Sequence, residues 1–200
     1  MKNFAIARNL IRLAREVVML DFPEIRQAFG FDCGAAACKA VLAYYGIDII
    51  ESDLMKRLGT REDGTPSAGI VRVCQDYGLD VSEGVLTIDE LKQAISDGYP
   101  VIIALQAWAE DKDIDWSKEW EEGHYCVAVG YGDGRIIFED PSDFHRQYLT
   151  EDELMERWHD TGVEGSSEEG KKFIQFGIIV KGKKKFTSDR VKKMEGSIHG

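Results

Sequence analysis

A glutamine and a cysteine lie six residues apart near the start of this chain, in the segment QAFGFDCG at residues 27–34. Cysteine attacks a carbonyl carbon as a thiolate, and a helix N-terminus favours the thiolate because its unpaired N–H groups stabilise negative charge. Asp32 is a good helix cap, so the spacing predicts that Cys33 begins a helix. The side-chain amide of Gln27 and the backbone N–H of Cys33 could then donate to a developing oxyanion.

A cysteine nucleophile needs a histidine to take up and return its proton, and a third group to orient that histidine. His124 is the one of four histidines that opens an apolar strand. Asp140 ends the following strand, and the Gly-Asp-Gly sequence at 132–134 predicts a tight hairpin turn between the two strands. The hairpin should therefore bring His124 and Asp140 together at one end of two antiparallel strands.

The other cysteines lack such a context. We expect Cys38, Cys74 and Cys126 to pack in the core, the usual place of a free cysteine. Cys126 shares a strand face with His124, so lining the same site is its alternative role. A zinc site made of Cys33, Cys38, Cys74 and His124 matches no standard ligand spacing. No metal and no other cofactor is expected.

Secondary-structure patterns predict an α+β protein, with helices on one side of an antiparallel sheet. Helices are expected over 33–45, 52–58, 66–77 and 87–98, and a further helix after the capping box formed by Thr150 and Glu153. Strands are expected over 101–105, 125–131, 135–139 and 173–180, with a flexible loop over 162–172.

Length and composition fit a single domain. Two hundred residues, 44% of them hydrophobic, can supply a core without disulfides. We expect this domain to span 22–181, preceded by an amphipathic helix within 1–21 and followed by a basic, flexible tail at 182–200. The N-terminal helix is expected to pack on the domain, and its arginines make contact with a membrane surface or a partner the alternative.

The net charge of −11 argues against a nucleic-acid partner, because phosphate binding needs a basic surface. An acidic surface would suit a positively charged peptide. No apolar run reaches membrane-spanning length, and the N-terminal segment has no apolar run long enough for a signal peptide. Without a disulfide-like cysteine pattern, the chain is expected in the reducing cytoplasm.

These motifs resemble the bacteriocin-processing, or double-glycine leader, cysteine peptidases, a papain-like family. The family pattern is Gln, five residues, then Cys-Gly; Gly-His-aromatic opening a strand; and Asp-Pro about sixteen residues after the histidine. This chain carries the three motifs at 27–34, 123–125 and 140–141, and the resemblance covers about residues 22–150. Connecting features also match, namely Tyr44-Tyr45-Gly46, Gly64-Thr65-Pro66-Ser67 and Tyr99-Pro100-Val101-Ile102.

The resemblance implies a papain-like fold whose N-terminal helices pack on an antiparallel sheet, and hydrolysis of a peptide or protein substrate through a thioester. It implies that Cys33 is the nucleophile, His124 the base and acid, Asp140 the orienting group and Gln27 the oxyanion-hole residue. Two alternatives remain open. One is a peptide-binding module of the same fold without turnover, although such relatives tend to lack the cysteine. The other is a different thiol acyl-transfer enzyme, an amidase or transpeptidase.

Many family members are domains of peptide-exporting ABC transporters. This sequence has neither membrane spans nor a Gly-x-x-x-x-Gly-Lys-[Ser/Thr] phosphate loop, which indicates a freestanding member. An acidic insertion at 109–122 precedes His124, and our hypothesis is that it overhangs the cleft and influences substrate choice.

Overall fold

An antiparallel sheet forms the centre of the molecule. The computed structural model describes residues 17–110, 113–188 and 191. The strands in this part of the chain are β1 Val18–Met19, β2 Asp80–Val85, β3 Val101–Gln106, β4 Gly123–Gly132, β5 Arg135–Glu139, β6 Gln147–Thr150, β7 His159–Thr161, β8 Lys172–Ile174 and β9 Phe176–Lys181. Seven strands form one sheet in the order β2-β9-β3-β4-β5-β6, with β1 paired to β4, while β7 and β8 pair separately.

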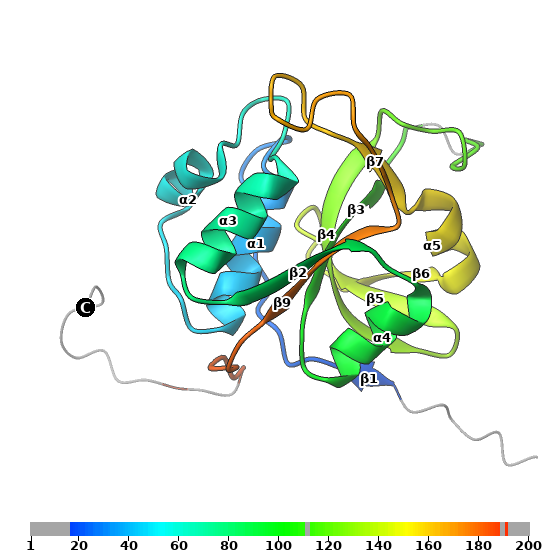
Figure 1. Cartoon of the computed structure of the whole chain (residues 1–200). Helices are drawn as coiled ribbons and strands as arrows, with labels where there is room; N and C mark the ends of the chain where they lie inside the picture. Colours follow the sequence, from blue (N-terminus) through cyan, green and yellow to red (C-terminus); the bar gives the residue numbers. More distant parts are fainter. Residues whose placement is uncertain (1–16, 111–112, 189–190, 192–200) are drawn as a thin grey trace, which may run out of the picture.

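Helices cover both faces of this sheet (Figure 1). The described residues form α1 Cys33–Tyr44, α2 Glu51–Leu58, α3 Ser67–Asp76, α4 Ile88–Ser96 and α5 Glu151–Arg157. The first three pack with Ile102 and Val127 in one core, and the last two pack with Ile103 and Cys126 in another. The predicted α+β class with N-terminal helices on an antiparallel sheet is confirmed. The expectation that all helices lie on one side is wrong, because β3 is buried along its whole length and both of its apolar faces need cover.

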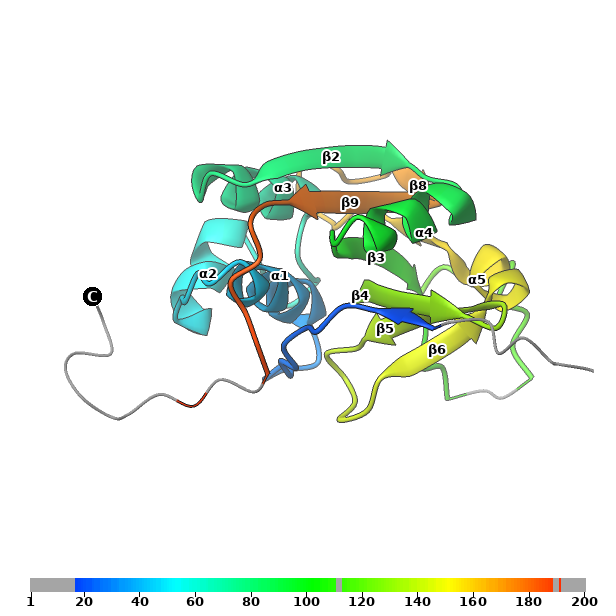
Figure 2. The same cartoon turned by 90° about the horizontal axis from the view of Figure 1, so that it is seen from below.

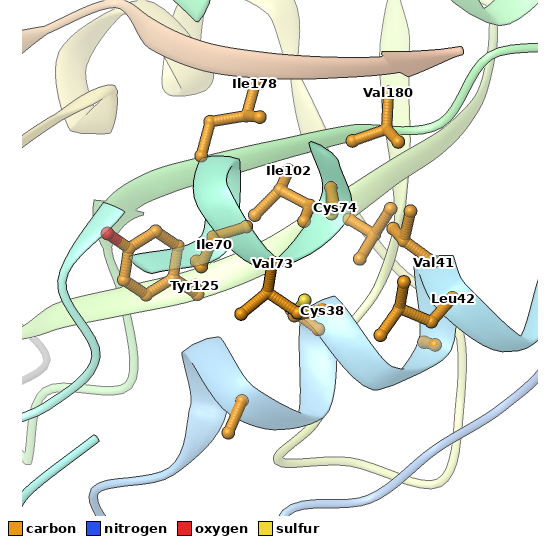
Figure 3. Packing of buried hydrophobic residues seen from close by; sticks show 14 of the residues in the cluster. Cys38, Val41, Leu42, Ile70, Val73, Cys74, Ile102, Tyr125, Ile178 and Val180 are labelled. Atoms are coloured by element: carbon orange, nitrogen blue, oxygen red, sulfur yellow. The ribbon is translucent and has the colours of Figure 1, made fainter. Parts of the chain in front are cut away.

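The first helix, α1, is buried on nearly all sides, and Figure 3 shows its side chains meeting those of α3 and the sheet. Small side chains allow this close approach: a Cβ added to Gly34 would stand 2.7 Å from the Cβ of Thr65. The helix ends as predicted, with Gly46 in the left-handed conformation at φ 77°. This packing fixes the position of Cys33 relative to the sheet.

Only the last residues of the N-terminal helix predicted within 1–21 are described, and they are not helical. Residues 1–16 lie outside the described part of the chain. Val18 and Met19 instead form β1, which pairs with Tyr131 and Gly130 of β4 (Figure 2). Glycine in β4 explains the pairing, because a Cβ on Gly130 would stand only 2.9 Å from the carbonyl oxygen of Val18.

The C-terminal part also differs from the prediction. The single strand expected over 173–180 is divided into β8 and β9 by Gln175, which has a φ of 51°. The loop before it is tied down, because the buried Glu168 carboxylate accepts hydrogen bonds from the N–H and hydroxyl of Ser67 at the start of α3. The domain extends past residue 181, since Phe186 packs on the first core. No helix within the described residues is long and apolar enough to cross a bilayer.

Candidate active site

Cys33 is the first residue of α1, as its sequence context predicted. The predicted side-chain cap is wrong, however: the Asp32 carboxylate turns back and accepts from the backbone N–H groups of Ala28 and Phe29, at 3.1 and 3.0 Å. Burial explains this choice, because Asp32 has no exposed surface and the loop amides give it two donors. The first turn of α1 therefore keeps its N–H groups free of a side-chain cap, next to the Cys33 sulfur.

His124 and Asp140 are brought together by the hairpin of β4 and β5. The distance between Nε2 of His124 and Oδ1 of Asp140 is 2.8 Å, and both side chains are buried. The turn has positive φ at both central residues, Asp133 and Gly134, the backbone that matches the twist of paired strands. Since Nε2 faces the carboxylate, Nδ1 is the nitrogen that remains for a thiol.

Two further donors hold the Asp140 carboxylate. The indole N–H of Trp108 donates to Oδ2 at 2.9 Å, and the backbone N–H of Ser142 donates to Oδ1 at 2.8 Å. Burial acts to raise the pKa of Asp140, but the bond to His124, its charge and these two donors outweigh it, so the pKa is lowered. Asp140 is therefore held as a carboxylate, the form that orients an imidazole and stabilises an imidazolium.

The surroundings of His124 favour its charged form. Burial acts to lower its pKa, but the charge of a Cys126 thiolate, the hydrogen bond to Asp140 and contacts with the thiols of Cys126 and Cys33 raise it well above the ordinary value. We attribute the direction chiefly to Asp140, because burial raises the pKa of Cys126 to about 11 and keeps that thiol protonated.

Gln27 lies beside this pair. Its side-chain oxygen accepts from the Ser142 hydroxyl at 3.0 Å, and its amide nitrogen donates to the Phe29 carbonyl at 2.7 Å. The backbone N–H of Gln27 also donates to the carbonyl of Pro141 at 3.1 Å. An amide nitrogen has two hydrogens, so one donor of Gln27 remains available.

The segment before Gln27 is fixed by an ion pair between the partly buried Arg26 and the buried Glu139. Arg26 donates through Nη1 to Oε1 of Glu139 and to the carbonyl oxygen of Asp140, both at 2.8 Å. Glu139 is 1% exposed, and Arg146 also contacts it. This pair holds the segment before α1 against the end of β5. The contact sets the distance between Gln27 and Asp140.

An open cleft of about 310 Å³ lies next to Cys33. Its other walls are Asp63, Gly64 and Thr65 before α3, Trp120, Glu121, Gly123 and Tyr125 around the start of β4, and residues 160–164. Trp120 and Glu121 belong to the acidic insertion, as our hypothesis of an overhanging insertion requires. Trp116 instead lies under Arg157, whose guanidinium is 3.8 Å from the ring centre.

Cys126 faces a different cavity. This second space, of about 210 Å³, is lined by Cys126, Trp108 and Asp140, together with Gln147, Arg157 and apolar side chains. Cys126 packs in the second core, as expected, and it is not among the residues that line the Cys33 cleft. Of the two thiols near His124, Cys33 is the one that reaches the polar cleft.

One group of side chains among the described residues could hold a metal ion. His124, Cys126 and Asp140 each offer a ligand atom, and these atoms lie within 4.8 Å of one another. Zinc would need the Cys126 thiolate, which burial disfavours, and would replace the His124–Asp140 hydrogen bond. Cys38 and Cys74 lie against each other in the core, away from this group.

Four residues of the site region were missed in the sequence: Trp108, Ser142, Asp160 and Glu168. Trp108 and Ser142 complete the surroundings of Asp140, Asp160 lines the cleft, and Glu168 holds the loop after β7 to the start of α3. Of these four, Ser142 could have been predicted from the sequence, because it follows Asp-Pro at a turn where a backbone N–H commonly bonds an aspartate side chain. The other three act over long sequence separations that no local pattern encodes.

A cysteine at the start of a buried helix, packed against an antiparallel sheet that carries a His–Asp pair, is the arrangement of the papain-like cysteine peptidase fold. The chain belongs to the peptidase C39 family, whose sequence pattern matches residues 21–167. The chain is also similar in sequence to an uncharacterized protein of Methanothermobacter marburgensis, with 25% identity over 118 residues that cover 59% of this chain and 70% of that protein.

Solved structures share the fold. A protein of Bacillus anthracis described as C39-like peptidase superposes with a TM-score of 0.63 at 16% identity, covering 85% of this chain and 100% of that one. The peptidase domain of Streptococcus ComA, a bifunctional ABC transporter, gives 0.57 at 19% identity, covering 78% and 95%. A double glycine motif protease from an AMS/PCAT transporter, solved with its leader peptide, gives 0.56 at 19% identity, covering 81% and 92%.

Proposed function

We propose that this protein is a cysteine peptidase in which Cys33 attacks the peptide carbonyl and His124, oriented by Asp140, transfers the proton. The observation that carries the proposal is the 2.8 Å contact between buried His124 and Asp140, beside a cysteine that both begins α1 and lines an open cleft. Membership of the C39 family supports the same reaction class.

The acylation step uses three residues. The Cys33 sulfur bonds to the carbonyl carbon, and the carbonyl oxygen takes up the negative charge. The free amide hydrogen of Gln27 and the N–H of Cys33 are the donors we assign to this oxyanion. His124 then gives the proton on Nδ1 to the leaving amine, the C–N bond breaks, and a thioester remains.

The deacylation step reverses the proton transfer. His124 takes a proton from a water molecule, whose oxygen bonds to the thioester carbon. The second oxyanion collapses, the C–S bond breaks, and the Cys33 thiolate and the carboxylic acid product are released. Asp140 stays ionised throughout and keeps the imidazole in place.

The substrate we propose is a peptide or an extended protein segment. The cleft is open and polar, and its walls come from the loop before α3, the insertion and the segment after β7. A related protease was solved with a leader peptide, which supports a peptide ligand for this cleft. An amine in place of water would give transpeptidation from the same thioester, and product analysis separates the two reactions.

Thiol alkylation against pH tests the nucleophile. The full-length protein is treated with iodoacetamide between pH 5 and 9, and the modified cysteines are mapped by mass spectrometry. We expect Cys33 to react rapidly below pH 7, where an ordinary thiol of pKa about 8.5 is almost wholly protonated. A His124→Ala variant should move this reactivity to higher pH.

The same experiment can overturn the proposal. If Cys33 reacts no faster than Cys38, Cys74 and Cys126 across the range, the activated thiol does not exist, and a peptide-binding module becomes the better assignment. If Cys33 reacts rapidly, a library of internally quenched peptides identifies the substrate, and Cys33→Ala is its inactive control.

A further inference from the structure

Asp160 is a buried carboxylate on the wall of the Cys33 cleft. It lies in β7 with 9% of its surface exposed, and it shares the cleft lining with Cys33. A Cβ added to Gly123 would stand 2.5 Å from Oδ1 of Asp160, so the missing side chain at Gly123 makes room for this carboxylate. Asp160 therefore stands beside the residue that precedes His124.

The two oxygens of Asp160 differ in their partners. Oδ1 accepts from the N–H of Thr161 at 2.8 Å and from the amide of Gln106 at 3.4 Å. Among the residues that the structure describes, none donates a hydrogen bond to Oδ2, and no lysine or arginine forms an ion pair with Asp160. Oδ2 is not one of the fully buried unpaired atoms, so this oxygen keeps a face open to the cleft and to a ligand.

The rest of the cleft is acidic. Asp63, Glu121 and Glu164 line it with Asp160, whereas no lysine or arginine does so within the described part of the chain. Arg61 offsets one of these charges, since its guanidinium pairs with Asp63 at 3.3 Å. The remaining carboxylates would attract a cation and repel an acidic ligand.

The pKa of Asp160 also indicates a carboxylate whose negative charge has no partner. Burial raises the pKa of Asp160 to about 7, although the Thr161 N–H, the Gln106 amide and the charge of His124 act to lower it. Nearby Lys172 does not offset the charge directly, because its ammonium lies 4.3 Å from the ring centre of Trp120. A cation brought by a ligand would supply the missing charge.

We propose that Asp160 binds a lysine or arginine side chain of the peptide substrate, and so determines specificity next to the bond that Cys33 attacks. The substrate class is then a basic peptide. This inference rests on the proposed peptidase function for its role in turnover, but the binding of a basic peptide can be measured without catalysis.

The test uses binding to the full-length Cys33→Ala protein, in which no thioester can form. The probes are N-acetylated, C-terminally fluorescein-labelled octapeptides of Gly and Ala, in which a single lysine is moved through each position, with matching norleucine and glutamate series. Norleucine preserves the chain length of lysine without its charge. Fluorescence anisotropy gives Kd for each peptide.

We expect lysine at one or two adjacent positions to bind at least about tenfold more tightly than norleucine, and glutamate to bind less tightly than either. Arginine at the same position should also be preferred over norleucine.

In Cys33→Ala/Asp160→Asn the ratio of the affinity for lysine peptides to that for norleucine peptides should fall towards one. Asparagine keeps the Oδ1 acceptor for Thr161, and thermal unfolding checks that the fold is intact. In Cys33→Ala/Asp76→Asn, with an equal charge change at the far end of α3, the ratio should persist.

Several outcomes would overturn the assignment. The assignment is overturned if the lysine and norleucine peptides bind equally well at every position. It is also overturned if the preference for lysine persists in Cys33→Ala/Asp160→Asn. A uniform loss of affinity for both series in Asp160→Asn would show a purely structural role. By contrast, a lysine preference without any hydrolysis by the unmodified protein would support the Asp160 site while removing the proposed peptidase activity.

Discussion

The indole N–H of Trp108 donates to Oδ2 of Asp140 at 2.9 Å, on the side of the carboxylate away from His124. Trp108 adopts a φ of 65°, which is unusual for a bulky residue. Such backbone strain persists only where surrounding contacts hold it, and it is concentrated at functional sites. The hydrogen bond to Asp140 is one such contact.

Trp108→Phe should therefore slow the reaction of Cys33. A hydrogen bond to a charged group is worth about 1.5–3 kcal/mol, so we expect kcat to fall about 10- to 100-fold. Loss of the donor should also raise the pKa of Asp140, which moves the acidic limb of the pH–rate profile to higher pH. The profile is measured with the cleaved peptide or by Cys33 alkylation. Trp116→Phe is the control, and superimposable profiles for Trp108→Phe and the unmodified protein would refute the role of Trp108.

The two thiols near His124 should behave differently when each is removed. Cys33→Ala should abolish peptide cleavage, by a factor of about 10⁴ or more, because no thioester can form. Cys126→Ala should retain most of the cleavage, since Cys126 faces the second cavity and has a pKa of about 11. The measurement is the initial rate of cleavage of one quenched peptide by each variant. Loss of cleavage in Cys126→Ala, with Cys33 alkylation intact, would reverse the assignment of the nucleophile.

Gln27→Ala should separate oxyanion stabilisation from thiol activation. Peptide hydrolysis passes through an oxyanion, so kcat should fall about 10²- to 10³-fold. Alkylation by iodoacetamide forms no oxyanion, so the rate of Cys33 alkylation should stay close to that of the unmodified protein. Gln93→Ala on α4 controls for the substitution itself. Equal losses in both reactions would mean that Gln27 positions the site instead of binding the oxyanion.

Asp160→Asn should stabilise the protein in a pH-dependent manner. Burial raises the pKa of Asp160 to about 7 from about 4 in the unfolded chain. The native state then binds the proton more tightly, so Asp160 lowers the free energy of unfolding progressively between about pH 4 and 7. The increase in the free energy of unfolding caused by Asp160→Asn should be near zero below about pH 4. It should reach up to about 4 kcal/mol above about pH 7.

Urea unfolding at pH 4, 6 and 8 measures this gain. Asp76→Asn is exposed and should show no comparable trend with pH. A gain from Asp160→Asn that does not change with pH would contradict the raised pKa. A loss of stability at every pH would mean that the hydrogen bonds of Asp160 matter more than the burial of its charge.

Local patterns predicted much of the fold because their determinants lie within a few residues of one another. The capping boxes at Thr87 and Thr150 form as expected, since each needs only a glutamate three residues later. The hairpin between β4 and β5 formed for the same reason. The Asp32 cap failed although its actual partners, the N–H groups of Ala28 and Phe29, lie only four and three residues upstream, because the course of that loop has no local signature in the sequence.

Short strands were missed where tertiary pairing, and not local preference, creates them. β2 carries polar residues and a glycine, and it exists because β9 pairs with it along its whole length. β1 forms in place of the end of a predicted helix because the glycines of β4 leave room for a neighbouring strand. Such outcomes depend on residues more than 90 positions apart.

The sequence alone determined the order and spacing of Gln27, Cys33, His124 and Asp140, and the hairpin that unites the last two. Chain connectivity and turn geometry are enough to place residues that lie on adjacent strands. Only the tertiary structure decided which thiol faces the cleft, how Trp108 supports Asp140, and that Asp160 shares a wall with Cys33. These relations arise because packing in three dimensions brings distant segments together and removes water from their charged groups, and neither effect leaves a periodic signal in the sequence.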